Sequence, residues 1–375
     1  MVFDPSPGMG DMSDEDLYGT GLAARAADVA EAAGQYAEEA DIRRVLSPEV
    51  SKALVMAGFA RHFVPRRFGG AAGSAVDLLA ATADVGARCT SAAWCGALAA
   101  GAARMGVFLP EQGQAELWAD GPDAYVVGAL VPSGRPKPVS GGWRLSGRWA
   151  FTSGADHADW AFVAVPIPGG DTGEYSFLAV PRSEFTVVDT WHNTGMRGTG
   201  SNTVVLDDVF VPKDRAFDRD DMLRGHPVGS TAPCHTVPLR ALSGVIFAAA
   251  GLGAARGAFR AWMPGAGERV GAEAVARAAG EIDMAAQLLR RAAAGCDVSA
   301  VSPTDALRNP YDCALAADVL VTAVERMFRT AGTRGQLATD PLQRFWRDLH
   351  CLSSHTALRL GPSGTTYGEH LLSAS

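Results

Sequence analysis

The residues best suited to chemistry lie in two segments near the middle of the chain. In the first, Leu145–Val165, the ring of Phe151 is followed directly by the hydroxyl side chains of Thr152 and Ser153. The second, Trp191–Pro212, combines an aromatic ring, a cation, two hydroxyl groups and three glycines: Trp191, Arg197, Thr199, Ser201, Gly195, Gly198 and Gly200. Glycines let backbone N–H groups approach a ligand closely. We therefore predict a ligand site with an apolar wall and hydroxyl groups. The alternative is a strand-end turn beside a glycine-rich hairpin around a core tryptophan.

One histidine near the C-terminus is the strongest candidate for proton chemistry. His355 lies in the stretch SSHTA, and His350 stands five residues earlier. Imidazole titrates near neutrality, so His355 can take a proton from a substrate or hold an oxygen atom by hydrogen bonding. Five residues turn a helix by about 140°, so His350 would point elsewhere. We expect His355 to be catalytic and His350 either to support the site through other residues or to be structural; packing on a helix face is the alternative for His355.

Two further patterns are better explained by packing than by chemistry. The six cysteines include no CxxC pair, so we expect no metal site and mostly reduced, buried thiols. Gly251, Gly253 and Gly257 resemble part of a dinucleotide-binding fingerprint, but a helical run precedes them where that fingerprint needs a strand. We expect these glycines to allow close helix packing, and the chain to lack a nicotinamide site of its own.

The elements that must position these residues change type twice along the chain. Residues 17–108 are alanine-rich and mostly helical in pattern; Val55, Phe59 and Phe63 recur every four residues, as on one helix face. Short runs rich in β-branched and aromatic residues follow, which predicts an antiparallel barrel or sandwich. We expect strands at 124–131, 143–151, 160–165, 175–180, 185–188 and 203–211. Helices return at about 238–263, 271–295, 304–331 and 341–358, with Pro303 and Pro341 at helix starts.

These changes of texture divide the chain into four parts. We expect a flexible tail over residues 1–16, a helical domain over 17–120, a β-domain over 121–226 and a helical bundle over 227–375. A net charge of −8 without a basic segment argues against nucleic acid and anionic membrane surfaces as partners. We find no apolar run of the roughly 18 residues that span a bilayer, and no signal-peptide pattern, so we expect a cytoplasmic protein.

Both middle segments resemble the β-domain signatures of the acyl-CoA dehydrogenase superfamily. Leu145, Gly147, Phe151 and Ser153 match its LNG…WITN strand, and the ending DDVFVP is similar to its edVrVP strand. Arg347–Asp348 matches the pair of its RD helix, and the order of elements agrees over residues 17–372. The resemblance implies an α+β fold with an N-terminal helical domain, a central antiparallel β-barrel or sandwich and a C-terminal four-helix bundle.

The resemblance also implies roles for the candidate residues. A hydroxyl at the position of Ser153 lies beside flavin N5, where it can stabilise a flavin C4a-hydroperoxide. Trp191 and Ser201 reproduce the ten-residue spacing of two flavin contacts in the monooxygenase branch. Trp94 and His355 would line the substrate pocket. The other implied flavin contacts are Phe151, Thr152, Arg197, Thr199, Arg269 and Arg334. The last two would reach the flavin of a neighbouring subunit, which implies a homotetramer.

The C-terminal segment separates two reactions of this superfamily. Many dehydrogenases carry a catalytic glutamate in an IYEGT stretch, whereas SSHTA stands here and no carboxylate falls between Asp348 and Glu369. A histidine at this position resembles the monooxygenase branch. We therefore expect an enzyme that takes FMNH2 or FADH2 from a separate NAD(P)H:flavin reductase, reacts it with O2 and hydroxylates a small aromatic or polyketide-like substrate. The alternatives are an N-oxygenase of an amine or amino sugar, an FAD-dependent acyl-CoA dehydrogenase and a catalytically silent binding protein.

Overall fold

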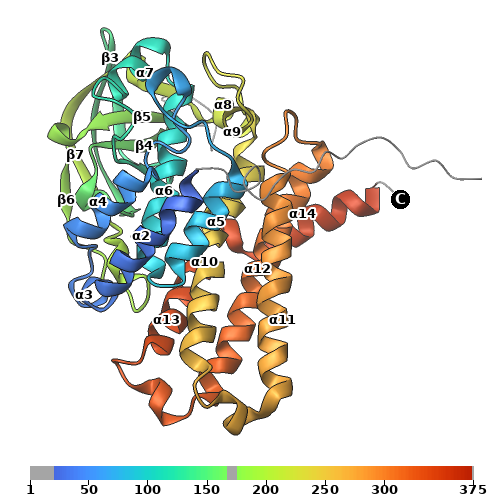
Figure 1. Ribbon diagram of the computed structural model, residues 1–375. Helices are drawn as coiled ribbons and strands as arrows, with labels where there is room; N and C mark the ends of the chain where they lie inside the picture. Colours follow the sequence, from blue (N-terminus) through green and yellow to red (C-terminus); the bar gives the residue numbers. More distant parts are fainter. Residues whose placement is uncertain (1–20, 167–174, 374–375) are drawn as a thin grey trace, which may run out of the picture.

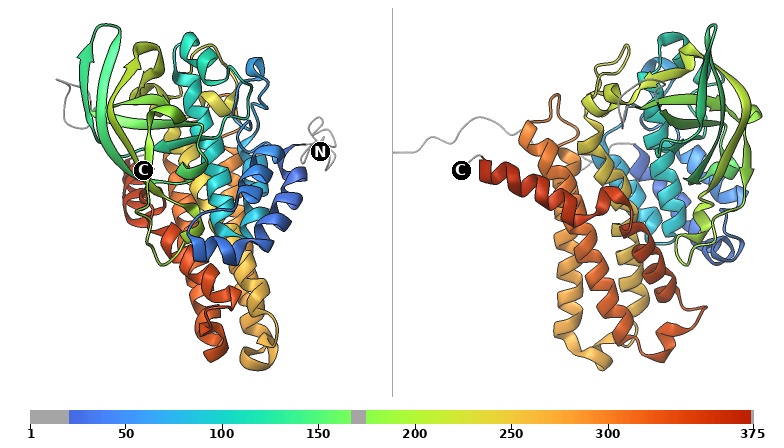
Figure 2. Two further views of the ribbon diagram at one scale, coloured as in Figure 1. Left: turned by 90° about the vertical axis from the view of Figure 1, so that its left-hand side faces the viewer. Right: turned by 180° about the vertical axis from the view of Figure 1, so that it is seen from behind.

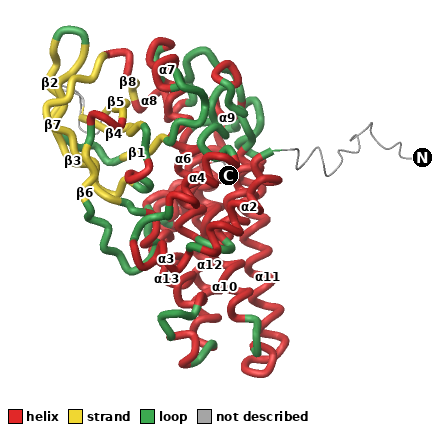
Figure 3. Tube along the Cα trace, turned by 60° about the vertical axis from the view of Figure 1, so that its left-hand side comes forward, coloured by secondary structure: helices red, strands yellow, loops and turns green. Residues whose placement is uncertain are grey.

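The computed structural model describes residues 21–166 and 175–373, and the tail expected at residues 1–16 lies outside them. The strands gather on one side of the molecule, and helices fill the rest (Figures 1 and 3). Along the described chain, helices give way to strands between Leu117 and Val126, and helices return at Arg219. The expected α+β fold is confirmed.

The N-terminal part is helical, as its alanine-rich periodicity predicts. Its helices are α2 (Leu22–Gln35), α3 (Ala37–Arg43), α4 (Pro48–Ala57), α5 (Ala75–Gly86), α6 (Thr90–Met105) and α7 (Glu111–Leu117). Ser47 starts α4 by accepting a hydrogen bond from the backbone of Val50. The expectation that Phe59 and Phe63 continue this helix is wrong. Gly58 ends α4 in a left-handed conformation, and both phenylalanines are buried beyond it.

The β-region consists of two four-stranded sheets, in the orders β1-β4-β5-β8 and β2-β3-β7-β6. The strands are β1 (Val126–Ala129), β2 (Arg135–Val139), β3 (Gly142–Thr152), β4 (Trp160–Pro166), β5 (Tyr175–Pro181), β6 (Thr186–Val188), β7 (Asn202–Pro212) and β8 (Ala216–Asp218). Their pairings are antiparallel except for β1 with β4, which run parallel. Side chains of both sheets share one core, which includes Leu145, Trp149, Val163 and Leu178.

The sequence analysis did not predict two of the strands, β2 and β8, for physical reasons. The edge strand β2 has the sequence RPKPV and is largely exposed, so it lacks an apolar pattern. Proline is tolerated on an edge because no backbone N–H is needed there. The other, β8, has only three residues and lies at the edge of the first sheet.

The C-terminal part contains the expected four-helix bundle. It is formed by α10 (Leu239–Trp262), α11 (Ala266–Ala294), α12 (Pro303–Thr330) and α13 (Pro341–Ser353), which lie alongside one another (Figure 2). Pro303 and Pro341 stand in the first turns of their helices, as predicted. The short helices α8 (Arg219–Arg224) and α9 (Pro233–Thr236) precede the bundle, and α14 (Leu360–Ser373) follows it.

The core helix of the bundle is α10. Its length and composition would suit a membrane span, but 83% of its most apolar window is buried inside the fold. A Cβ atom added to Gly253 would lie 2.4 Å from the carbonyl oxygen of Ala83 on α5. One added to Gly257 would lie 2.4 Å from the ring of Phe345 on α13. These glycines therefore let helices approach closely, as the sequence analysis expected.

The helix expected at 341–358 is shorter than predicted. The observed α13 ends at Ser353, and a short turn, η8 (Thr356–Leu358), separates it from α14. His355 has an extended backbone conformation, with φ −61° and ψ 138°, and caps this turn. The side chain of His355 is therefore oriented by a break between helices and not by a helix face.

Candidate functional site

A continuous chain of hydroxyl groups runs between the β-region and α6. The Nε1–H group of Trp94 donates to Ser153 Oγ at 3.0 Å, and Ser153 Oγ lies 2.8 Å from Ser201 Oγ. Ser201 Oγ lies 2.6 Å from Thr199 Oγ1, which donates to the carbonyl oxygen of Met196 at 2.8 Å. The structure thus brings together one aromatic side chain from α6 and three hydroxyls from the two segments singled out in the sequence.

The donor and the acceptor of each hydrogen bond can be assigned from the groups at the two ends of the chain. The carbonyl of Met196 only accepts, so the hydroxyl of Thr199 donates to it and accepts from Ser201. Ser201 must then accept from Ser153, which itself accepts from Trp94. A hydroxyl has one donor and two acceptor sites. The Ser153 hydroxyl therefore retains one acceptor site, which suits a ligand that presents an N–H group.

An exposed aromatic wall lies next to this chain. Phe151 is 70% exposed and has a φ of 62°, an uncommon conformation for a bulky residue. Its ring meets that of Trp191 edge to face, with the centroids 6.2 Å apart. The indole of Trp191 is fixed by its own hydrogen bond to the carbonyl of Met196, at 2.8 Å. This arrangement offers an apolar surface that a flat ring could cover.

His355 is held by packing on one side and by the backbone on the other. Its ring stacks on Phe247 with the centroids 3.8 Å apart, and meets Trp94 edge to face at 5.8 Å. Its Nδ1 accepts a hydrogen bond from the backbone N–H of Ala357 at 3.2 Å. Burial, and then the nearby charge of Arg359, lower the pKa of His355 to about 4. The imidazole is therefore neutral near pH 7, with its proton on Nε2.

The loop that carries Trp191 and Thr199 is held in place by α13. The buried carboxylate of Asp348 accepts a hydrogen bond from the backbone N–H of Met196 at 2.6 Å. Burial raises the pKa of Asp348 to about 6. Gly195 lies so close to α13 that an added Cβ would be 2.1 Å from the carbonyl oxygen of Arg347. The Arg–Asp pair recognised in the sequence therefore positions this loop.

Four of the expected site residues do not join the hydroxyl chain or the aromatic wall, namely Thr152, Arg197, Arg269 and Arg334. The hydroxyl of Thr152 donates to the carbonyl of Trp149 at 3.2 Å and is buried in the β-region, so its side chain is not brought to the site. Arg197 donates to the carbonyl of Asp41 at 2.7 Å and thereby ties the loop to α3. Arg269 donates to the carbonyls of Trp262 and Pro264, both at 3.0 Å.

Arg269 and Arg334 lie at the end of the bundle that is distant from the sheets. Arg269 follows the connection between α10 and α11, and Arg334 lies in η7 (Thr333–Gln336) between α12 and α13 (Figure 1). Both side chains are exposed. The fold brings these two arginines to one end of the bundle, and within one chain it separates them from the hydroxyl chain.

Sequence reasoning missed Phe247 and interpreted His350 correctly. Phe247 lies in the apolar run VIFAAAG of α10, where a residue that contacts a functional group has the same pattern as a core residue. His350 Nε2 lies 3.2 Å from a carboxylate oxygen of Glu325, and its ring packs on Trp346. His350 therefore supports the bundle and does not contact His355.

The thiols and the metal-ligating side chains complete the description of this site. All six cysteines are free, and five of them are buried, as expected. Within residues 21–166 and 175–373, we find no group of three or more His, Cys, Asp or Glu side chains that could hold a metal ion.

The exposed Phe151 wall and the free acceptor site on Ser153 do fit a flavin, whose flat ring carries an N–H group at its edge when reduced.

The chain is similar to known proteins over most of its length. Residues 245–360 match the family described as acyl-CoA dehydrogenase, C-terminal domain. FADH(2)-dependent resorcinol hydroxylase, oxygenase component, of Rhizobium sp. (strain MTP-10005) is 32% identical over 94% of this chain and 93% of its own length. Among solved structures, 3-HSA hydroxylase from Rhodococcus sp. RHA1 has a TM-score of 0.89 and 27% identity, covering 94% of this chain and 97% of its own. XiaF from Streptomyces sp., in complex with FADH2 and glycerol, has a TM-score of 0.86 and 25% identity over 94% of this chain and 96% of its own.

The chain therefore belongs to the acyl-CoA dehydrogenase superfamily, and its relatives place it in the branch of oxygenase components. It is a flavin-dependent monooxygenase of the two-component type, and it uses reduced flavin and O2. The identification made from the two β-segments and from SSHTA is confirmed.

Proposed function

We propose that this chain hydroxylates a small phenolic or related aromatic compound, with reduced flavin supplied by a separate NAD(P)H:flavin reductase. The hydroxyl chain that ends at Ser153, beside Trp94 and His355, is the observation that carries this proposal. Relatives of similar length are named as aromatic hydroxylases, among them resorcinol hydroxylase and p-hydroxyphenylacetate 3-hydroxylase. The ring of His355 contacts Trp94 and Phe247, so a phenol held by Nε2–H would lie beside aromatic side chains.

The bound reduced flavin would supply oxygen transfer from O2, through the C4a-hydroperoxide expected from the sequence. Phe151 and Trp191 would hold its ring, and Ser153 Oγ would accept a hydrogen bond from its N5–H group. The hydrogen bond from Trp94 and the one to Ser201 fix the direction of the Ser153 hydroxyl. This hydroxyl would therefore hold the N5 proton in place and slow the release of hydrogen peroxide before the substrate reacts.

His355 would act as a hydrogen-bond donor through Nε2–H and not as a general base. To receive a proton on Nε2, the ring would have to carry its own proton on Nδ1, but Nδ1 accepts a hydrogen bond from Ala357 and is therefore unprotonated. The lowered pKa of His355 also opposes its protonation near pH 7. The neutral ring is suited to hold the oxygen atom that is transferred, or the oxygen of a phenol, by a hydrogen bond.

Arg269 and Arg334 would serve the site of a neighbouring subunit. Both lie at one exposed end of the bundle, far along the fold from Ser153, so they would reach a flavin only in an oligomer. A flavin phosphate is a suitable partner for two exposed guanidinium groups. This assignment supports the homotetramer that the resemblance implies.

Single-turnover oxidation tests the proposal. The protein is mixed without air with photoreduced FAD or FMN, then with air-saturated buffer and a phenol such as resorcinol. We expect a long-lived absorbance band of the oxygenated flavin and a catechol-type product that carries one oxygen atom from 18O2. Reduction of oxidised flavin by an acyl-CoA, or peroxide release without any product across a panel of phenols, would contradict it.

A further inference from the structure

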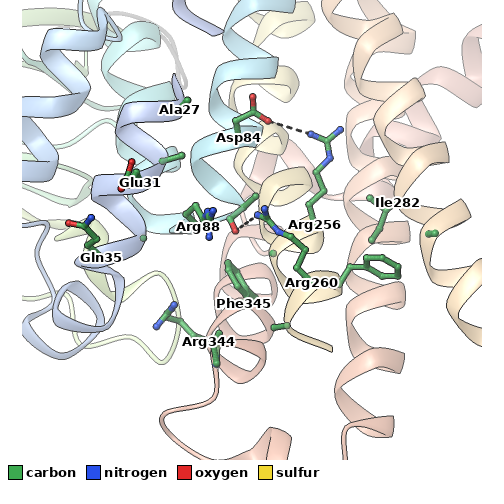
Figure 4. A pocket seen from close by; sticks show the side chains of 18 of the residues that line it. Ala27, Glu31, Gln35, Asp84, Arg88, Arg256, Arg260, Ile282, Arg344 and Phe345 are labelled. Carbon is green, nitrogen blue, oxygen red and sulfur yellow. Dashed lines mark hydrogen bonds and ion pairs between the residues drawn. The ribbon is translucent and has the colours of Figure 1, made fainter. Parts of the chain in front are cut away.

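A cleft of about 1220 Å³ opens between the N-terminal helices and the bundle. Side chains from α2, α5, α10, α11 and α13 surround it (Figure 4). None of the residues that line it belongs to the hydroxyl chain or to the aromatic surroundings of His355. Helix α13 contributes different residues to the cleft and to the loop that carries Trp191 and Thr199. Arg344 and Phe345 line the cleft, whereas Arg347 and Asp348 contact that loop.

Four arginine side chains face this cleft, namely Arg88, Arg256, Arg260 and Arg344 (Figure 4). Arg256 lies 3.9 Å from the carboxylate of Asp84. Arg260 donates only to a neutral group, the carbonyl oxygen of Ala87, at 2.6 Å. Among the described residues, no carboxylate lies within ion-pair distance of Arg88, Arg260 or Arg344.

These guanidinium groups repel one another. The pKa of Arg260 is lowered first by burial and next by the charge of Arg88, and the charge of Arg256 adds to the effect. Asp84 partly offsets this, but burial raises the pKa of Asp84 itself. Protein cations that lie together are usually matched by anions. The carboxylates of Glu31, Asp84 and Asp283 also line the cleft, so four guanidinium groups face three carboxylates and a small excess of positive charge remains.

The floor of the cleft is apolar and close-packed. It includes Ala30, Ile282 and Phe345, all of which are buried. Cations at the rim above an apolar floor suit a ligand with a charged end and an uncharged body.

We propose that this cleft binds a phosphorylated organic molecule, at a site separate from the flavin. A phosphoryl group carries close to two negative charges at neutral pH and three acceptor oxygens. It can therefore receive bidentate hydrogen bonds from two guanidinium groups at once, such as those of Arg88 and Arg260. A single carboxylate has one charge and two oxygens and would leave the second guanidinium unmatched. This proposal does not depend on the oxygenation chemistry.

Titration calorimetry with adenosine diphosphate, pyrophosphate and adenosine, at constant ionic strength, tests the proposal. We expect the two phosphate compounds to bind and adenosine to show no binding. Arg88→Ala and Arg260→Ala should each weaken binding at least about tenfold, since each removes a charge-assisted hydrogen bond. Arg260→Lys, which keeps the charge but loses the planar fork, should fall between these variants and the wild-type protein.

Two controls separate this cleft from other cationic surfaces. Arg224→Ala removes an exposed arginine that pairs with Asp220 outside the cleft, and it should leave the affinity unchanged. Titration with saturating FAD present should also leave it unchanged, because FAD would occupy Arg269 and Arg334, whereas a loss of binding under that condition would assign the phosphate to the end of the bundle and overturn the proposal. Undetectable binding at millimolar ligand, or equal affinity in properly folded Arg88→Ala and Arg260→Ala proteins, would overturn it as well.

Discussion

The two nitrogen atoms of His355 can be tested separately, because two amides each reproduce one of them. Glutamine can place an N–H group near the position of Nε2, whereas asparagine can place an acceptor near that of Nδ1. In the structure, Nδ1 accepts from Ala357, and Nε2–H is the remaining donor of a ring that contacts Trp94 and Phe247. If His355 is a neutral donor, His355→Gln keeps the important group and His355→Asn keeps only the cap of η8.

The expected size of the effect follows from one hydrogen bond. A hydrogen bond to a group that carries or develops charge contributes about 1.5–3 kcal/mol. We therefore expect His355→Asn and His355→Ala to raise the ratio of peroxide released to product formed by roughly 10- to 150-fold. His355→Gln should stay within about tenfold of the wild-type ratio. All three should still bind reduced flavin, because His355 contacts Trp94 and Phe247 and not the Phe151 wall.

The assay measures oxygen uptake, peroxide and hydroxylated product together, between pH 5 and pH 8. Because the pKa of His355 is lowered to about 4, its charge should not change in this range, and the coupling ratio should show no inflection from it. A rising limb near pH 6 to 7 that disappears in His355→Gln would identify His355 as a base. Equal loss of product in His355→Gln and His355→Ala would also refute the donor role.

Three further substitutions test the supporting geometry. Ser153→Ala leaves the Nε1–H of Trp94 without its acceptor and should speed peroxide release about tenfold in single-turnover experiments, whereas unchanged release would remove Ser153 from the proposed site. Gly195→Ala forces a Cβ against the carbonyl of Arg347 and should lower the free energy of unfolding by about 1–3 kcal/mol, measured by urea titration with flavin affinity in parallel. His235 is neutral in the fold because burial lowers its pKa to about 4, with Nε2–H donating to Phe63 and Nδ1 accepting from Ser230. In the unfolded chain the imidazole of His235 binds a proton below about pH 6.5, so the free energy of unfolding should fall by about 2 kcal/mol between pH 7.5 and pH 5 because of this residue. His235→Asn should reduce that fall, and an identical pH dependence in the variant would contradict the assignment.

The elements that the sequence predicted well are those with local signals. The strands at β3, β4, β5 and β7 and the four bundle helices carry a clear period of hydrophobic residues, and Pro303 and Pro341 mark two starts. The errors have local causes too. Gly58 stops α4 before Phe59, and the run SSHTA ends α13 at Ser353, because left-handed glycine and capping side chains override helical periodicity.

The family, the reaction class and most residues of the hydroxyl chain were determined by the sequence alone. Phe151, Ser153, Trp191, Thr199 and Ser201 could be named because they lie within two short segments that resemble the signatures of the family. Residues that lie close together in the sequence can be recognised there as a motif.

Only the tertiary structure decided how these groups act. It placed Trp94 of α6 against Ser153, stacked Phe247 of α10 on His355, and turned Nδ1 of His355 to Ala357. These contacts fix the direction of the hydroxyl chain and the proton position on the imidazole. The physical reason is that hydrogen-bond direction and burial depend on neighbours from distant elements, and the periodicity of a single helix or strand does not record them.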